Sequence, residues 1–165
     1  MTKRGGPTTQ SGVFYQNSIA AVFLGRLCDR RKKDRSVQVV EVRSEVPSTS
    51  VDDIVVTFLD GHRMWIQAKE NLATSGKVWE ELWANFATQR RAVAFGLQDE
   101  LILYVGTYAS VYDELKEAAN RARGSSNPAE WISRLTRDQS DAITKVKNCL
   151  TPDGADLDSP LWHLM

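Results

Sequence analysis

The sequence predicts an α/β protein whose elements follow the order helix, three strands, helix, strand and further helices. Two β-branched and aromatic runs flank an Asp-Gly turn at residues 60–61, which indicates a β-hairpin. Apolar residues recur at helical spacing on both sides of this hairpin, and an almost wholly apolar run of strand length covers 100–107. The chain has 165 residues, 42% of them hydrophobic, so we expect one core and one domain over 13–150.

The first helix is expected to begin at Val13, after a flexible polar segment at 1–12. Its apolar face follows the helical repeat and consists of Tyr15, Ile19, Val22, Phe23 and Leu27. The helix is predicted to end in a basic run at 26–35, in which the candidate contacts to DNA phosphates are Arg30, Arg31, Lys32 and Lys33. A solvated helix end explains the same run, since cations also stabilise the negative pole of a helix. A strand over 36–43 is expected to follow.

Polar residues gather at one end of the predicted hairpin at 51–70. Asp52 and Asp53 open its first strand, while Gln67 and Lys69 close its second. In an antiparallel hairpin these two ends lie side by side, and Gln67 and Lys69 share a face because side chains alternate. An exposed strand end with an edge lysine has the same pattern, so spacing alone leaves both interpretations open.

This convergence of side chains suits metal-dependent phosphate chemistry. Asp53, with Asp52 or an upstream glutamate, offers the hard oxygen ligands that Mg²⁺ prefers, and the amide oxygen of Gln67 adds a neutral ligand. Lys69 beside the metal is suited to orient or deprotonate a water and to stabilise the charge that develops on a phosphate.

The second half of the chain is predicted to be mostly helical. Its elements are a helix over 77–95 with a buried stripe that reaches Val93, a strand over 100–107 covered on both faces, a helix over 112–123 and a helix over 127–150. Asn127 as a cap and Pro128 in the first turn mark the start of the last helix. The tail 151–165 ends in an apolar cluster, and we expect it to be a linker to a missing sensor or oligomerisation domain.

Composition excludes several classes of protein. No apolar run has the roughly 20 residues of a membrane span, and the N-terminal segment lacks the apolar core of a signal peptide. The two cysteines, Cys28 and Cys149, lie far apart and no Cys/His cluster has zinc spacing, so we expect a cytoplasmic protein with reduced thiols and no membrane contact. With 21 basic and 21 acidic residues, the chain has no overall attraction to nucleic acid.

The element order and four motifs resemble those of the PD-(D/E)XK nuclease superfamily. The motifs are SGVFYQNSIAAVFL at 11–24, VDDIVV at 51–56, IQAKE at 66–70 and WEELWANFATQ at 79–89, and the resemblance covers about the first 105 residues. Within this superfamily, the chain resembles in particular the double-stranded-DNA endonuclease effector domain at the N-terminus of bacterial antiphage proteins. In these proteins the domain is fused to SAVED sensor domains (CBASS systems) or to STAND NTPases (Avs-type systems). The resemblance implies a restriction-endonuclease-like αβββαβ core, a mixed central sheet flanked by helices, with additional C-terminal helices.

The resemblance also implies roles for individual residues. Asp53 is the central metal-binding acid, Gln67 occupies the usual Asp/Glu position, and Lys69 is the catalytic lysine. Gln16 on the first helix orients a ligand or a phosphate. The implied substrate is double-stranded DNA, the implied cofactor is Mg²⁺ with Mn²⁺ as a substitute, and the active form is a homo-oligomer.

Three further acids are candidates to complete the metal site. Asp52 neighbours Asp53 on the strand, and one of the two is expected to point away because strand side chains alternate. Glu41 and Glu45, near the end of the preceding strand, are the other candidates, and an exposed strand carboxylate is the alternative for each.

Gln67 departs from the acid that is commoner in the superfamily. An amide in place of a carboxylate removes one negative charge from the metal site, so we expect weak binding of a single Mg²⁺. Two other functions stay open: a catalytically inactive nuclease fold that binds DNA or a partner, and a metal-dependent ribonuclease.

Overall fold

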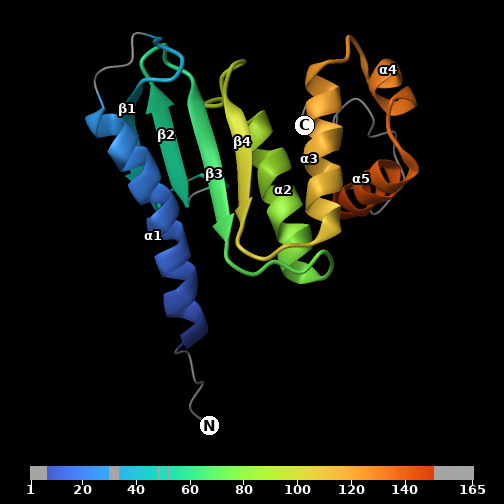
Figure 1. Cartoon of the computed structure of the whole chain (residues 1–165), viewed down its shortest axis with the longest axis horizontal. Coiled ribbons are helices and arrows are strands. Elements are labelled where there is room, and N and C mark those ends of the chain that lie inside the picture. Colours follow the sequence, from blue (N-terminus) through green and yellow to red (C-terminus); the bar gives the residue numbers. More distant parts are fainter. Residues whose placement is uncertain (1–6, 30–33, 48, 52, 151–165) are drawn as a thin grey trace. The chain divides into compact units, whose positions relative to one another are not determined.

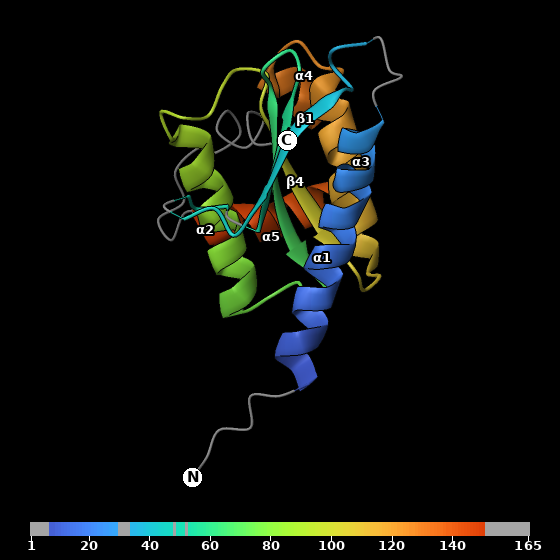
Figure 2. The same ribbon diagram turned by 90° about the vertical axis from the view of Figure 1, so that its left-hand side faces the viewer.

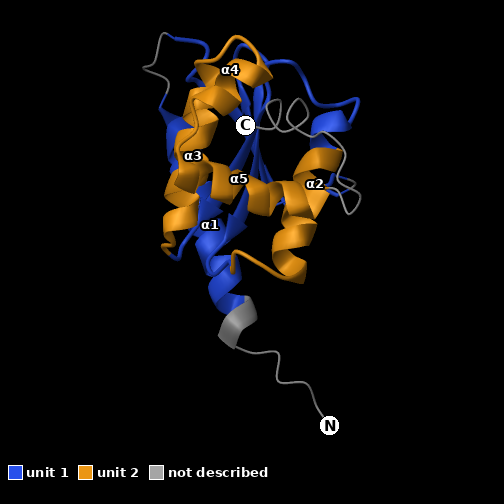
Figure 3. Ribbon diagram, turned by 90° about the vertical axis from the view of Figure 1, so that its right-hand side faces the viewer, with its two compact units in different colours: residues 1–72, 89–107 blue, residues 73–88, 108–165 orange. Residues whose placement is uncertain are grey.

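The computed structural model describes residues 7–29, 34–47, 49–51 and 53–150 (Figure 1). Its elements, in chain order, are α1 (Pro7–Cys28), β1 (Val39–Ser44), β2 (Ile54–Phe58), β3 (Arg63–Lys69), α2 (Lys77–Arg91), β4 (Glu100–Val105), α3 (Ser110–Arg123), α4 (Pro128–Ser133) and α5 (Arg137–Leu150). The predicted α/β class is confirmed. The chain divides into two compact units, unit 1 with residues 1–72 and 89–107, and unit 2 with residues 73–88 and 108–165 (Figure 3).

Unit 1 contains a four-stranded mixed sheet in the order β1-β2-β3-β4. β2 pairs antiparallel with β1 and with β3, while β3 and β4 run parallel (Figure 1). The predicted hairpin is therefore confirmed as β2 and β3. Its turn depends on Gly61, whose φ of 96° suits a residue without a side chain. Next to the turn, the ring of His62 stacks on Phe58 with ring centroids 4.2 Å apart.

Helix α1 lies along one face of this sheet (Figure 2). It begins at Pro7 and not at Val13, so part of the segment predicted to be flexible is helical; proline suits a first helical turn because its φ is already fixed. Phe23 is buried against β-strand residues as predicted, whereas Val22 is 57% exposed. Among the helices of the described ranges, none is long and apolar enough to cross a membrane.

Strand β4 is last in the strand order, and its residues are half-buried or exposed. Tyr104, for example, is 39% exposed. The prediction of a strand covered on both faces was wrong, because an apolar run of strand length is also found in a half-covered edge strand. Its parallel pairing places Val105 beside Lys69.

Helix α2 ends at Arg91, before the predicted end of the helix at residue 95, because Phe95 turns back toward the sheet. The Phe95 ring lies 6.5 Å from the Trp65 ring and 5.0 Å from the guanidinium carbon of Arg90. Val93, predicted in the buried stripe, lies beyond the end of the helix and is fully exposed.

The loop after α2 is fixed by the carboxylate of Asp99. This carboxylate accepts hydrogen bonds from the backbone N–H groups of Arg63 and Gly96, each at 2.9 Å, and from the Trp65 indole at 3.0 Å. Burial raises the pKa of Asp99, but these hydrogen bonds together hold it below its usual value.

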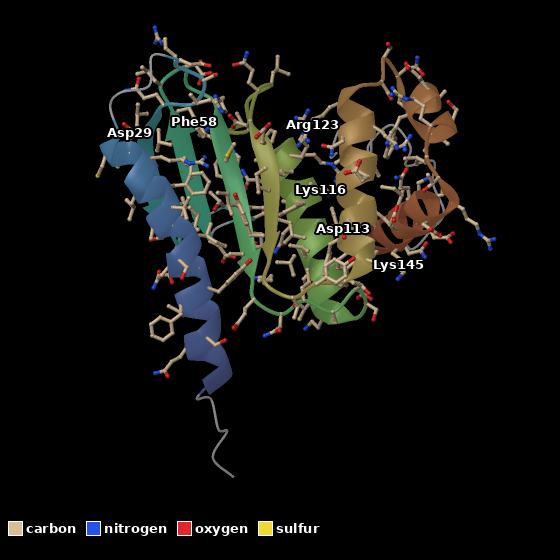
Figure 4. The ribbon with its side chains drawn as sticks, viewed as in Figure 1. Asp29, Phe58, Asp113, Lys116, Arg123 and Lys145 are labelled. Atoms are coloured by element: carbon tan, nitrogen blue, oxygen red, sulfur yellow. The ribbon has the colours of Figure 1, made fainter. Side chains whose placement is uncertain are left out.

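In unit 2, aromatic side chains form the buried stripe predicted on α2. Trp79 and Trp83 are both buried and meet edge to face, with ring centroids 5.4 Å apart. Trp131 of α4 is also buried, and its indole N–H donates to the carbonyl of Ala118 in α3 at 2.9 Å. The exposed face of α3 carries Asp113, Lys116 and Arg123 (Figure 4).

The helix predicted over 127–150 is two helices. Asn127 caps α4 as expected, since its side chain accepts from the N–H of Glu130 at 2.9 Å. A second cap then starts α5: Thr136 Oγ1 accepts from the N–H of Gln139, and Gln139 Oε1 accepts from the N–H of Thr136. This reciprocal pair is a capping box, and it separates α5 from α4.

Candidate functional site

The carboxylate of Asp53 lies where β2 begins and β3 ends. Ile54 pairs with Ile66, so Asp53 comes beside Gln67 as the hairpin register predicts. Asp53 Oδ2 accepts hydrogen bonds from the Gln67 side-chain amide and from the backbone N–H of Ala68, the latter at 2.7 Å. Gln67 is 4% exposed, whereas the Asp53 side chain is 16% exposed.

Lys69, the last residue of β3, completes this group. Its Nζ lies 3.6 Å from Asp53 Oδ2, and its side chain is 34% exposed. The ammonium thus pairs with the carboxylate and still reaches solvent. All of these contacts are made by Oδ2, so Oδ1 is the oxygen that we expect to accept a cation.

The main chain of Asp53 is held from two other elements. Its carbonyl accepts a hydrogen bond from Gln16 Nε2 of α1 at 2.9 Å, and one from the backbone N–H of Glu45 at 3.1 Å. Glu45 follows β1 with a φ of 49°, and its side chain is exposed. Gln16 therefore reaches the site as predicted, whereas Glu45 contacts it through its backbone.

A cavity of about 400 Å³ opens between α1 and the end of β3. The residues that line it are Ser11, Gly12, Val13, Gln16, Asp53, Ala68, Lys69, Glu70 and Asn71. Three of the predicted site residues, Gln16, Asp53 and Lys69, lie on its wall. Gln67 is not among the lining residues, and it contacts the site through its hydrogen bond to Asp53.

The sequence patterns did not single out Ser11 and Glu70. Ser11 Oγ donates a hydrogen bond to Glu70 Oε2, which joins α1 to the end of β3. Alternation along a strand predicts that Glu70 points away from the side of Lys69. The strand ends at Lys69, however, so alternation does not apply to the next residue and both side chains line the cavity.

Other predicted residues lie elsewhere or outside the described residues. Glu41 pairs with Arg43 at 2.9 Å and accepts from Thr57, and the hydrogen bond from Arg43 is the main cause that lowers the pKa of Glu41. Asp52 and the basic run Arg30, Arg31, Lys32 and Lys33 fall outside the described residues.

The site offers a small set of oxygen donors for a divalent cation. Within the described ranges, no three His, Cys, Asp or Glu side chains come together as metal ligands. The Asp53 carboxylate and the Gln67 amide are adjacent hard-oxygen donors, and Mg²⁺ commonly keeps several water ligands beside one or two carboxylates. This donor set fits one weakly held Mg²⁺, provided that the Gln67 amide turns its oxygen to the cation.

Comparisons with known proteins add no further identification, since no protein-family model, curated protein or solved structure matches the chain.

Proposed function

We propose that the chain is a Mg²⁺-dependent endonuclease that hydrolyses phosphodiester bonds of double-stranded DNA, with Mn²⁺ as a substitute for Mg²⁺. The observation that carries the proposal is the meeting of Asp53, Gln67 and Lys69 at the end of one hairpin, beside an open cavity. A carboxylate and an amide oxygen can hold a metal ion, and an ammonium beside them can stabilise the negative charge that develops in phosphate hydrolysis.

Each residue has a part in this reaction. Asp53 and Gln67 would hold Mg²⁺, which when bound polarises the scissile phosphate. Lys69 orients the attacking water and stabilises the negative charge of the transition state from the cavity wall. Gln16 fixes the backbone of Asp53 and so keeps the carboxylate in position.

The resemblance in motifs and element order supports a more specific role. In this proposal the four-stranded sheet is the core of a restriction-endonuclease-like domain, and the domain is the effector of a bacterial antiphage protein. A fused SAVED or STAND region would sense infection and assemble the chains into an active homo-oligomer in the cytoplasm. The preference for DNA over RNA comes from the resemblance.

A plasmid-cleavage assay with and without Mg²⁺ tests the proposal. Wild-type protein at high concentration should cut the plasmid only with Mg²⁺, and Lys69→Ala should lose this activity while remaining folded, because Lys69 is partly exposed. Lys116→Ala, at an exposed lysine of α3 (Figure 4), is the matched control and should cut like wild type. Equal cutting by Lys69→Ala would contradict the assignment, and a parallel arm with RNA separates the two nuclease classes.

One observation favours a second candidate function, a binding module without catalysis. The Gln67 amide and the Ala68 N–H both donate to Asp53, so the carboxylate has hydrogen-bond partners without any cation. A module of this kind predicts DNA or partner binding that does not depend on divalent metal. Binding measured with Mg²⁺ and with a chelator distinguishes the two functions.

A further inference from the structure

The cavity contains a second carboxylate for which the proposed reaction has no role so far. Glu70 lies on the cavity wall directly after Lys69. Ser11 Oγ of α1 donates to one of its oxygens, Oε2, and thereby holds the carboxylate against the helix. The other oxygen, Oε1, is a hydrogen-bond acceptor.

The backbone that carries Glu70 is fixed by the segment after β4. Gly106 N–H donates to the Lys69 carbonyl and Thr107 Oγ1 donates to the Glu70 carbonyl, both at 3.0 Å. Gly106 also packs so closely against Glu70 that a Cβ at position 106 would lie 2.7 Å from the Glu70 backbone carbonyl oxygen. A fixed main chain and a hydrogen-bonded side chain give Glu70 the preorganisation that a catalytic group needs.

Tyr15 of α1 lies near Glu70. Burial raises the pKa of Tyr15, and the proximity of Tyr104 and Glu70 raises it further, so Tyr15 stays a neutral hydroxyl. Among the described residues that line the cavity, the charged side chains are Asp53, Lys69 and Glu70.

Hydrolysis by water is accelerated when a positioned group takes the proton of the attacking water. An ammonium has no lone pair, so Lys69 orients the water but does not accept this proton. The carboxylate of Asp53 is engaged by Gln67, Ala68 and Lys69 and is assigned to the cation. Glu70 is the other carboxylate among the lining residues.

We infer that Glu70 is the general base of the proposed nuclease, an inference that rests on the proposed function. As the water oxygen forms its bond to phosphorus, its O–H bond breaks and the proton passes to Glu70 Oε1. The bond between phosphorus and the leaving sugar oxygen breaks, and that oxygen keeps the electron pair and takes a proton from solvent. Glu70 then releases its proton to solvent, which completes the cycle.

Glu70→Gln tests this role at nearly constant shape, because the amide oxygen still accepts from Ser11 but the side chain takes no proton. We expect the cleavage rate to fall by roughly 10²- to 10⁴-fold. Ser11→Ala keeps the Glu70 carboxylate and removes its hydrogen bond. This variant should lose less of the cleavage rate than Glu70→Gln does. Glu117→Gln, at an exposed glutamate of α3, is the matched control and should cut at the wild-type rate.

Chemical rescue and binding separate a base from a structural or metal-binding residue. Formate supplies a carboxylate, so it should restore cutting by Glu70→Ala and should not restore cutting by Lys69→Ala. Mg²⁺ affinity measured by calorimetry should be the same for Glu70→Gln and wild type. DNA affinity should match between Lys69→Ala and the double variant that also carries Glu70→Gln.

The outcomes distinguish this inference from the function on which it rests. Wild-type cutting together with an equally active Glu70→Gln overturns the general base alone. The general base is also overturned if Glu70→Gln cuts slowly and binds Mg²⁺ more weakly, and if formate does not restore cutting by Glu70→Ala. Glu70 would then be a ligand of Mg²⁺. Absence of metal-dependent cutting by wild type overturns the nuclease proposal and the inference with it.

Discussion

The contact between Asp53 and Gln67 determines how the site behaves without metal. Because the buried Gln67 amide donates to the partly exposed Asp53 carboxylate, the two side chains stabilise each other. A glutamate at position 67 would replace this donor with a second negative charge. An amide at this position therefore favours a stable site, and under the proposed function it implies low affinity for Mg²⁺.

Gln67→Glu should raise the affinity of the site for Mg²⁺ and lower the stability of the metal-free protein. Without metal, we expect the free energy of unfolding to fall by about 1–3 kcal/mol, since Asp53 loses a buried donor and gains a like charge. Mg²⁺ should bind more tightly than to wild type and recover the lost stability. Thermal unfolding with and without Mg²⁺ measures both effects.

Gln139→Glu is the matched control for this substitution, because Gln139 is also 4% exposed but lies in the capping box of α5. Glutamate is compatible with a capping box, so this variant should fold normally and show no response to Mg²⁺ beyond that of wild type. If Gln67→Glu is as stable as wild type, and if Mg²⁺ changes the thermal stability of neither protein, the result would argue against a cation at Asp53.

The sequence predicted the site residues of the hairpin better than the contact between Ser11 and Glu70 on the cavity wall. Asp53, Gln67 and Lys69 belong to one hairpin, whose register follows from its strands and turn alone. The contact of Ser11 with Glu70 depends instead on how α1 lies on the sheet, and side-chain periodicity carries no information about that placement.

At the scale of elements, β4 supports the end of β3 that carries the site. The parallel pairing of Val105 with Lys69 brings Gly106 against Glu70, where backbone approaches backbone. A side chain at Gly106 would have to displace this contact, since a Cβ would lie 2.7 Å from the Glu70 carbonyl oxygen. The close approach therefore links the position of Lys69 and Glu70 to the edge strand.

Gly106→Ala should destabilise the protein and slow cleavage together. Overpacking against a main-chain atom commonly costs about 1–3 kcal/mol, and the shift it forces moves the cavity wall. Urea unfolding gives the stability change, and the plasmid assay gives the rate. Gly25→Ala, in α1 with open space around the added methyl group, should be neutral or stabilise by up to about 1 kcal/mol. Similar behaviour of the two variants would contradict the proposed support.

The element boundaries show which signals a sequence carries. The cap at Asn127 was predicted because its signal is local, and the capping box at Thr136 has an equally local signal that apolar periodicity across 127–150 obscured. The half-exposed state of β4 depends on its place in the strand order, which its own residues do not specify.

At the scale of the whole molecule, the charge balance limits how a single chain binds DNA. The 21 basic and 21 acidic residues give no net attraction to a phosphate backbone. Several weak sites held together bind far more strongly than one, because later contacts form at a high effective concentration. If the chain is the proposed nuclease, its neutral charge suits control by assembly.

A fusion of the chain to an unrelated tetramer should raise plasmid cutting by at least about 10-fold at equal concentration of catalytic sites. The gain should shrink as salt rises, because the phosphate contacts are electrostatic. The same tetramer carrying Lys69→Ala should bind DNA and leave it intact, which separates binding from catalysis. Initial rates of supercoiled-plasmid loss, compared per site for monomer and tetramer, give the measurement. Equal rates per site would show that assembly is not the switch, and activity in the Lys69→Ala tetramer would show that the cutting arises from another site.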